Sequence, residues 1–407
     1  MIHARRWLIG LAAPLAVFVA LIVLLKQSDS GSAAPEPQSP AADNARGAEL
    51  LDLVTQGGPL GLYAKAQAAY ERAQAIDPND LDAAVGLATV AMGRHDFAEG
   101  LRLAQEARAL APRSVDALPV LVDANVELGR YGAATEALDR LVSLKPGVAS
   151  YARISYLREL HGDVTGALRA MRLARGAAAA NPPAIAFTSA LLGELALDLG
   201  RYELADREFR TALAAQPGFG PAEEGRAHLL AAQGEYRRSI REYRALTHTG
   251  RADVAASLAA IEDATGRTRA ARRHYEIAER RFAAELGSGL EADAGAVRFA
   301  ADIGEERKAV RLGRSTWRRA PSVTSADAYA WALSAAGRER ASLRMSRHAL
   351  ATGWRDPEML FRAGVVAKRA GAEGRARRLL ETALEASPRF HGVDAPAARS
   401  ILDRLGG

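Results

Sequence analysis

The stretch SALLGELALDLGRYELADREFRTALAAQP, at 189–217, decides the fold. Its first half is apolar and rich in leucine and alanine, and a Gly-Arg-Tyr turn at 200–202 separates it from the second half. In the second half, Ala205, Phe209 and Ala212 recur at i, i+4 and i+7, which is the period of one face of an α-helix. The stretch therefore predicts two helices joined by a tight turn.

The same sequence pattern recurs along the chain at a nearly constant interval. Pro78, Pro112 and Pro146 are spaced 34 residues apart, and Pro182 and Pro217 continue the series with small slips. Each closes a helical phrase such as ERAQAIDP or QEARALAP. A fixed period of about 34 residues is the signature of a repeat array, in which neighbouring units bury one another's apolar faces. An ordinary helical bundle with chance spacing is the alternative, and bundles need no fixed repeat.

The unit at 189–217 has Leu-Gly in its first helix, Gly-x-Tyr at its turn, Ala, Phe and Ala on its second helix, and a closing proline. In these positions it resembles the tetratricopeptide repeat (TPR). The resemblance implies an all-α fold, a TPR-type α-solenoid in which helix-turn-helix repeats form a right-handed superhelix. About ten tetratricopeptide-like repeats cover 48–390, and their boundaries stay open between 247 and 355. We expect 391–407 to be a C-terminal capping helix and tail, because a solenoid must cover its last apolar face.

The amino terminus carries an apolar segment. Residues 7–25, WLIGLAAPLAVFVALIVLL, contain no charge and are long enough to span a bilayer as a helix. We therefore expect 1–26 to form an N-terminal signal-anchor or transmembrane helix. Arg5 and Arg6 precede the segment, which predicts a cytoplasmic amino terminus and an exported remainder.

Two alternatives remain for this terminus, and a linker follows it. Export after signal cleavage is one alternative, although Pro35 makes the small-residue site at 32–34 a poor one. A twin-arginine export signal fits the sequence loosely. Residues 27–47 are rich in Pro, Ser and Ala, which predicts a flexible linker.

Composition and charge exclude some functions and favour others. The chain has 407 residues and no cysteine, which excludes disulfides, thiolate metal sites and a cysteine nucleophile. Residues 48–266 hold 23 Lys and Arg against 28 Asp and Glu, whereas 267–390 hold 25 against 15. The basic last third favours an acidic protein partner, with an anionic lipid or a polysaccharide as alternatives. Nucleic acid is disfavoured, because few aromatic residues stand between the arginines for base stacking.

The search for catalytic motifs predicts no enzyme. The histidines include no pair of the zinc-protease type, and His95 and His161 fall in turns, where solvated side chains are expected. The glycine-rich stretch GFGPAEEG at 218–225 matches no phosphate-binding spacing and follows no strand. We expect no catalytic residue, no cofactor, no metal site and no small-molecule substrate.

The family resemblance implies that the inner helices line a concave groove that binds a protein or peptide partner. The residues expected in this groove are Tyr156, Glu159, Glu194, His228, Arg298, Trp331, Phe361 and Lys368. Trp331 and Phe361 fit packing between helices equally well. Only one asparagine, Asn125, lies in an inner helix, so a groove that grips a peptide backbone with an asparagine ladder is disfavoured.

These observations predict a non-catalytic scaffold for protein–protein interaction. An anchored array rich in alanine and arginine resembles bacterial envelope proteins, which implies a single pass through the inner membrane, a periplasmic array and a role in envelope assembly. Two alternatives stay open. One is an accessory subunit of a glycosyltransferase or of a polysaccharide or protein export machine, and the other is a cytosol-facing TPR regulator.

Overall fold

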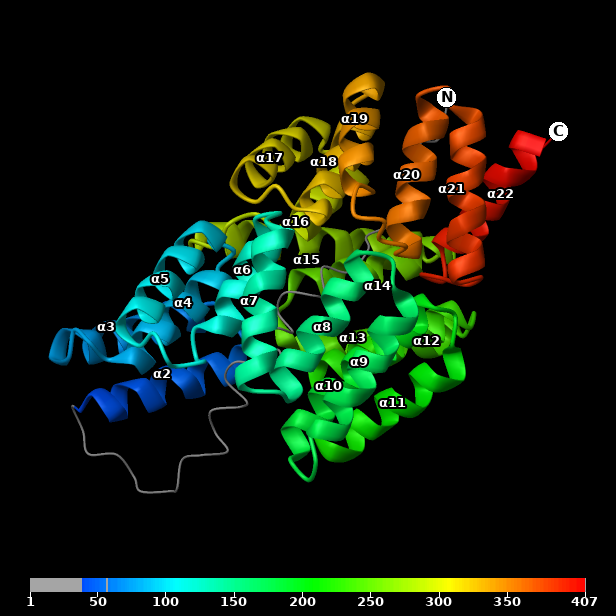
Figure 1. Ribbon diagram of the computed structural model, residues 1–407. Helices are drawn as coiled ribbons and strands as arrows, with labels where there is room; N and C mark the ends of the chain where they lie inside the picture. Colours follow the sequence, from blue (N-terminus) through cyan, green and yellow to red (C-terminus); the bar gives the residue numbers. More distant parts are fainter. Residues whose placement is uncertain (1–38, 56–57, 407) are drawn as a thin grey trace.

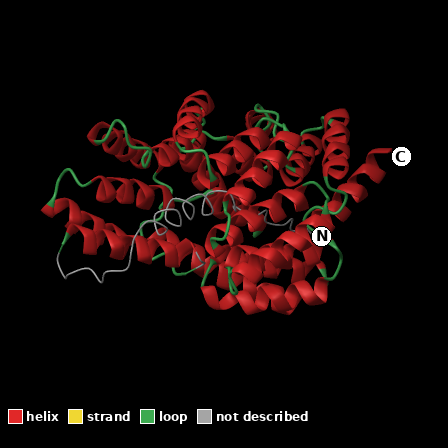
Figure 2. Cartoon of the chain, turned by 60° about the horizontal axis from the view of Figure 1, so that its bottom comes forward, coloured by secondary structure: helices red, strands yellow, loops and turns green. Residues whose placement is uncertain are grey.

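The computed structural model describes residues 39–55 and 58–406, and the regular elements in these ranges are helices (Figures 1 and 2). The expected transmembrane segment 7–25 lies outside the described residues. None of the helices described is both long enough and apolar enough to cross a bilayer.

The described chain forms ten helix pairs and one final helix. The inner helices of the pairs are α2 (Pro40–Thr55), α4 (Leu81–Gly93), α6 (Leu118–Glu127), α8 (Val148–Leu160), α10 (Pro182–Asp198), α12 (Gly220–Ala232), α14 (Ala252–Ala264), α16 (Ala294–Asp302), α18 (Val323–Ala335) and α20 (Pro357–Arg369). The outer helices are α3 (Leu62–Ile76), α5 (Phe97–Leu110), α7 (Tyr131–Leu144), α9 (Val164–Ala177), α11 (Tyr202–Ala215), α13 (Tyr236–Leu246), α15 (Thr268–Gly287), α17 (Glu306–Arg319), α19 (Glu339–Ala349) and α21 (Glu373–Ala386). A 3₁₀ turn, η2 (Thr247–Thr249), follows α13, and α22 (Asp394–Gly406) packs on α20 and α21 at the end of the array.

Inner and outer helices differ in how much of their surface is buried. The inner helix α10 is apolar nearly all round and buries most of its residues, because it packs against neighbours on several sides. The outer helix α11 buries only Ala205, Phe209 and Ala212, the three residues that share one face in the sequence pattern. Part of the expected linker differs from the prediction. Residues 40–47 belong to α2, whose apolar face at Leu50 and Leu51 packs against α3 and α4.

A glycine with positive φ ends most inner helices. In the unit at 189–217 this residue is Gly200, with φ 64°, and the N–H of Arg201 donates to the carbonyl of Ala196 at 2.8 Å. Such a left-handed residue lets the chain reverse while the last carbonyls of the helix keep a partner, and glycine adopts it without steric cost. His95, with φ 63°, occupies the equivalent turn of the second pair.

Small residues set the spacing between successive repeats. A Cβ added to Gly193 would lie 2.6 Å from the ring of Phe209, and one added to Gly225 would lie 2.3 Å from it. The ring thus fills the space between α10 and α12, and Phe209 itself is fully buried. The apolar period that predicts the outer helix also positions the ring that joins one repeat to the next.

The repeats between 247 and 355 depart from the 34-residue frame for a structural reason. Helix α15 has 20 residues, whereas α11 has 14, and the inner helix that follows, α16, has only nine. The longer outer helix and the shorter inner helix shift the turn positions against the regular frame.

The array curves until distant repeats touch. The N–H of Val323 donates to the hydroxyl of Tyr131 at 3.0 Å across 192 residues, and the indole N–H of Trp354 donates to Glu159 at 3.2 Å across 195. Figure 1 shows α6 and α7 near α16 and α18, and the bond between Val323 and Tyr131 joins α18 to α7. We call this contact between the early and the late repeats the seam. Turn glycines pack in it, since a Cβ on Gly129 would lie 2.3 Å from the carbonyl oxygen of Pro321. The concave face of the first repeats is therefore covered by the later ones.

Candidate functional site

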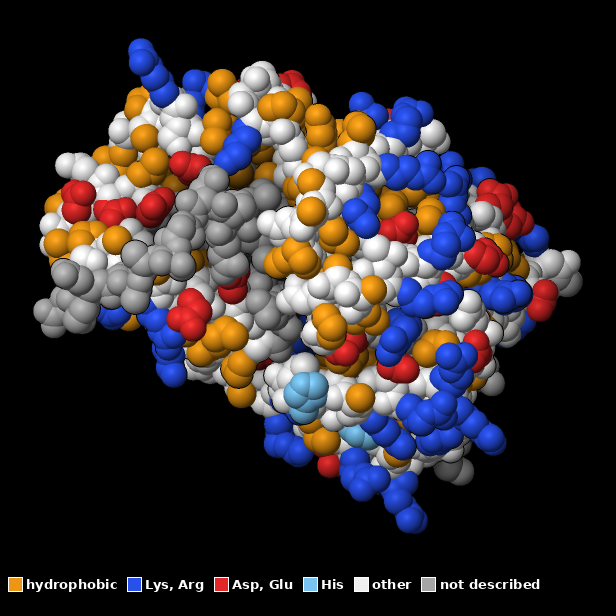
Figure 3. Space-filling view, turned by 90° about the horizontal axis from the view of Figure 1, so that it is seen from below, with side chains coloured by type: hydrophobic (Ala, Val, Ile, Leu, Met, Phe, Trp, Pro, Cys, Tyr) orange, Lys and Arg blue, Asp and Glu red, His pale blue; other side chains and the backbone are white. Residues whose placement is uncertain are grey.

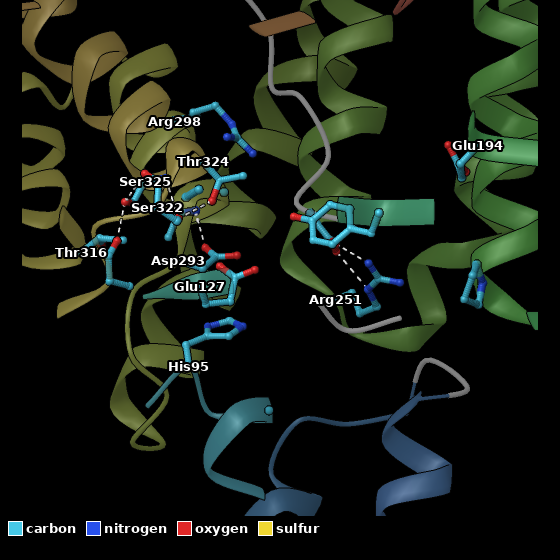
Figure 4. Close-up of a pocket in the computed structure, with 18 of the residues that line it drawn as sticks. His95, Glu127, Glu194, Arg251, Asp293, Arg298, Thr316, Ser322, Thr324 and Ser325 are labelled. Carbon is cyan, nitrogen blue, oxygen red and sulfur yellow. Dashed lines mark hydrogen bonds and ion pairs between the residues drawn. The ribbon is translucent and has the colours of Figure 1, made fainter. Parts of the chain in front are cut away.

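The inner helices, together with turns and parts of the outer helices α9, α15 and α17, line a cavity of about 340 Å³. Its lining extends from Val54 in α2 to Arg362 in α20, so most repeats contribute to it. Figure 4 shows part of the lining, with Glu127 and Asp293 on one side and Glu194 on the other. Its volume lies in the range of sites that hold a small molecule or a few residues of a peptide.

The lining is strongly acidic. Among the described residues, twelve carboxylates line the cavity against four arginines and no lysine. The carboxylates are Glu127, Glu159, Glu194, Asp198, Glu224, Asp253, Glu285, Glu291, Asp293, Asp327, Asp356 and Glu358. The arginines are Arg251, Arg298, Arg319 and Arg362.

Each of these arginines pairs with one of the carboxylates. Oδ2 of Asp327 lies 2.8 Å from a guanidinium nitrogen of Arg362 and 3.7 Å from one of Arg298. Arg251 lies 3.1 Å from Glu224, and Arg319 lies 2.8 Å from Glu291. The arginines are therefore engaged by carboxylates and offer little charge to a guest in the cavity.

Three cavity carboxylates, Glu127, Glu194 and Asp198, have neither a hydrogen bond nor an ion pair to any described residue. Burial, together with the nearby charge of Asp123, raises the pKa of Glu127 to about 8. Burial and the charges of Glu224 and Glu358 raise the pKa of Glu194 to about 8. Burial and the surrounding carboxylates also raise the pKa of Asp198 well above its ordinary value. These groups hold protons that a cationic guest would displace.

A second feature lies in the cavity wall, where two histidines meet a glutamate. His228 is 5% exposed, its Nε2 lies 3.9 Å from Oε1 of Glu358, and neither ring nitrogen has a hydrogen-bond partner among the described residues. The ring of His391 stacks edge-on against it, with the centroids 5.4 Å apart. Burial and the charge of His391 lower the pKa of His228 to about 4. Burial acts to lower the pKa of His391, but Asp394 and Glu358 outweigh it and raise that pKa to about 9.

Five of the residues expected in the groove do line this cavity. They are Tyr156, Glu159, Glu194, His228 and Arg298. The structure brings them together although they come from α8, α10, α12 and α16. That a partner contacts them stays a prediction.

The other three expected residues lie elsewhere. Trp331 is 3% exposed in the hydrophobic core, where its indole N–H donates to Asp302 at 2.8 Å. Phe361 is 1% exposed and packs against Phe390. Lys368 is half-buried near the end of α20 and is not among the cavity residues. The structure thus places both aromatic rings between helices, because large apolar side chains gain most from full burial.

The two turn histidines also have structural contacts. The Nδ1 of His95 lies 3.1 Å from the carbonyl oxygen of Glu291, and that of His161 lies 2.7 Å from the carbonyl oxygen of Leu157. His95 therefore joins the seam between distant repeats, instead of being a purely solvated turn residue.

The outer surface has the opposite charge on one side. Figure 3 shows Lys and Arg side chains gathered toward the side on which the carboxyl-terminal helices lie. Arg377 on α21 is engaged within the chain, since its guanidinium donates to the carbonyl of Leu405 at the end of α22.

The comparisons with known proteins bear on the repeats. Residues 58–80 and 189–219 match the tetratricopeptide repeat. The first match contains α3, and the second contains the end of α10 and all of α11. These repeats are the units whose outer helices carry Tyr70 and Phe209 against neighbouring inner helices.

Two solved structures are similar to the chain. One is PilW, a widely conserved type IV pilus biogenesis factor, with 20% identity, a TM-score of 0.41, and coverage of 52% of this chain and 98% of that one. The other is the APC/C hetero-tetramer Cut9-Hcn1, with 15% identity, a TM-score of 0.35, and coverage of 91% of this chain and 100% of that one. No curated protein matches the chain.

Sequence reasoning missed most of the cavity carboxylates, although α10 gives a signal for them. Glu194 and Asp198 are the only charged residues in this 17-residue helix, which is otherwise mostly apolar. Charges on a helix that is buried nearly all round face either a partner or a cavity. The histidine pair gives no such signal, because its members lie 163 positions apart in the sequence.

Proposed function

We propose that the chain is a non-catalytic scaffold that binds a positively charged segment of a partner protein in its acidic cavity. The observation that carries the proposal is that the carboxylates of Glu127, Glu194 and Asp198 on the inner helices have no partner among the described residues. A buried carboxylate without a partner destabilises the empty fold, and a lysine or arginine side chain from a guest would relieve that cost.

The repeat architecture supports a binding function over catalysis. Stacked repeats present a continuous inner surface to a guest, and each repeat contributes a few side chains to it. Seven of the twelve cavity carboxylates already pair with arginine or cap a helix: Glu224, Asp253, Glu291, Asp327, Glu358, Asp293 and Asp356. Glu159 and Glu285 accept hydrogen bonds from the indole of Trp354 and from the backbone N–H of Ala252. Glu127, Glu194 and Asp198 are left for recognition of the guest.

We propose that the scaffold is anchored in a bacterial inner membrane by residues 7–25, with the array on the periplasmic side in envelope assembly. The uncharged length of this segment and the two arginines before it support the anchor. The full chain should stay in the membrane fraction after alkaline washing. Recovery of a soluble mature form that begins near Pro35 would replace the anchor with a cleaved signal.

Two other roles fit the same cavity. As an accessory subunit of a glycosyltransferase or of an export machine, the chain would hold a basic segment of the enzyme or channel. As a cytosol-facing regulator it would have the inverted topology, and protease accessibility in intact cells separates that case from the periplasmic one.

Photo-crosslinking from two matched leucines tests binding in the cavity. Leu191 lines the cavity, whereas Leu173 on the outer helix α9 is 57% exposed. A photoreactive residue at position 191 should capture a discrete partner in intact cells, and the crosslinked peptide should be rich in lysine or arginine. Capture from position 173 alone, or of a peptide without basic residues at position 191, would contradict the proposal.

A further inference from the structure

Three side chains from distant parts of the chain meet beside the cavity, and two of them, His228 and Glu358, line it. His228 comes from α12, Glu358 from α20, and His391 from the turn between α21 and α22. Each offers one ligand atom, and these atoms lie within 4.8 Å of one another. His228 is 5% exposed and the other two are each 8% exposed, so water has little access to the group.

His228 is the clearest sign that this group binds something. Its ring is buried, and neither nitrogen has a hydrogen-bond partner among the described residues. A buried polar side chain without a partner costs free energy, and a bound ion removes that cost by coordinating the free nitrogen. Oε1 of Glu358 lies 3.9 Å from its Nε2, a distance that leaves room for an ion to draw both atoms inward.

Asp394 supplies an outer partner for the other histidine. Its Oδ2 lies 3.1 Å from Nδ1 of His391, and the aspartate is 1% exposed. A carboxylate on one ring nitrogen fixes the orientation of a histidine and leaves the other nitrogen to bind a metal. Asp394 would be a positioning residue and not a ligand.

We propose that His228, Glu358 and His391 bind a divalent transition-metal ion, of which Zn²⁺ is the best fit. Two imidazoles and one carboxylate are a ligand set that zinc uses at three of its four positions. The nitrogen ligands disfavour Mg²⁺ and Ca²⁺, which prefer oxygen. Since His228 and Glu358 also line the cavity, water would fill the remaining coordination position from that side.

The ion would fasten the end of the array onto its middle. The turn that carries His391 packs closely against α12. A Cβ added to Gly392 would lie only 2.4 Å from the carbonyl oxygen of Ala231. The hydroxyl of Tyr236 donates to the carbonyl of Gly392 at 2.8 Å in the same contact. A metal bound by His228 and His391 would cross-link these two segments in addition to these contacts, and would keep the cavity closed.

The rival possibility is that a proton occupies the place of the ion. A protonated His391 between Glu358 and Asp394 would satisfy the same carboxylates, although it would leave His228 without a partner. The two cases differ in whether the chain takes up metal.

The test is a calorimetric titration of the chelator-stripped, detergent-solubilised full chain with Zn²⁺, followed by Co²⁺ absorption spectroscopy. We expect one Zn²⁺ per chain, a higher midpoint of thermal unfolding with Zn²⁺, and visible Co²⁺ bands typical of histidine ligation. Glu358→Gln and His228→Gln should each weaken binding more than about 100-fold, because the loss of an outer-shell partner alone costs about 10–100-fold. Asp394→Asn should fall within that smaller range.

His248→Gln is the matched control, because this histidine is exposed and lies outside the group. It should bind Zn²⁺ as the wild type does. Circular dichroism of each variant shows whether it has folded, and the wild-type titration does not depend on any variant. If the wild-type chain takes up no Zn²⁺, or if the ligand variants bind it as well as His248→Gln does, the proposal is overturned and a proton takes the place of the ion.

Discussion

The hydroxyl of Tyr131 accepts a hydrogen bond from the backbone N–H of Val323 at 3.0 Å, although 192 residues separate them. Tyr131 begins the outer helix of the third pair, and Val323 begins the inner helix of the ninth. Contacts of this kind turn an array of nearest-neighbour repeats into a closed body with an interior. A solenoid without them would have an open groove, and its stability would be a sum over adjacent repeats.

Removal of this contact should weaken closure. Tyr131→Phe leaves the buried N–H of Val323 without its acceptor, which should lower the free energy of unfolding by about 1–3 kcal/mol. Hydrogen exchange should show the largest loss of protection at the start of α18. Tyr151→Phe, on the inner helix α8, removes a hydroxyl that bonds to no described residue across the seam, and it should leave α18 unchanged. Equal protection at α18 in both variants would mean that the bond does not hold the seam.

Two glycines should respond to alanine in opposite directions. Gly193→Ala places a methyl group 2.6 Å from the ring of Phe209, so overpacking should cost about 1–3 kcal/mol. Gly176→Ala, on the outer helix α9, meets nothing within 4 Å and should stabilise the helix by about 0.5–1 kcal/mol. Chemical denaturation of both variants measures the two changes in the free energy of unfolding. A stable Gly193→Ala variant would show that Phe209 does not fill the gap between repeats.

The array was predictable from the sequence to a greater extent than the cavity. The residues on one face of α11, together with Pro217, determine local structure, and local structure repeats with the sequence. The cavity depends on the curvature that brings Glu159 to Trp354, and curvature accumulates from small rotations that no single repeat encodes. For the same reason, the position of Trp331 in the core and not in the groove could not be read from its helix alone.

The cavity carboxylates should make stability fall as pH rises. The pKa of Glu194 is raised from 4.5 to about 8 in the folded chain, so the folded state binds a proton that the unfolded state releases. Its contribution to stability is therefore complete below pH 4.5 and is lost as pH rises through about 8. Glu194→Gln mimics the protonated form, and it should match the wild type at pH 4 and exceed it at pH 9 by more than about 1 kcal/mol, since one pKa unit is worth about 1.4 kcal/mol.

Glu203→Gln is the control for this titration, because Glu203 is exposed on the neighbouring helix α11. It should change the free energy of unfolding little. If the curves of Glu194→Gln and the wild type run parallel from pH 4 to pH 9, the carboxyl group of Glu194 is not desolvated in the cavity.

The most direct measurement of the central claim is the affinity of a lysine-rich peptide for the wild-type chain and for a variant that combines Glu127→Gln, Glu194→Gln and Asp198→Asn. A serine-glycine peptide of equal length and a variant with Glu203→Gln, Asp206→Asn and Glu208→Gln on α11 control for length and total charge. We predict that the basic peptide binds the wild type and the α11 variant at least about tenfold more tightly than it binds the cavity variant. This ratio corresponds to a difference of about 1.4 kcal/mol in binding free energy. We also predict that this affinity increases from pH 6 to pH 8, because binding releases protons from the cavity carboxylates. Equal affinity for both peptides, or a cavity variant that binds the basic peptide as well as the wild type, would contradict the account.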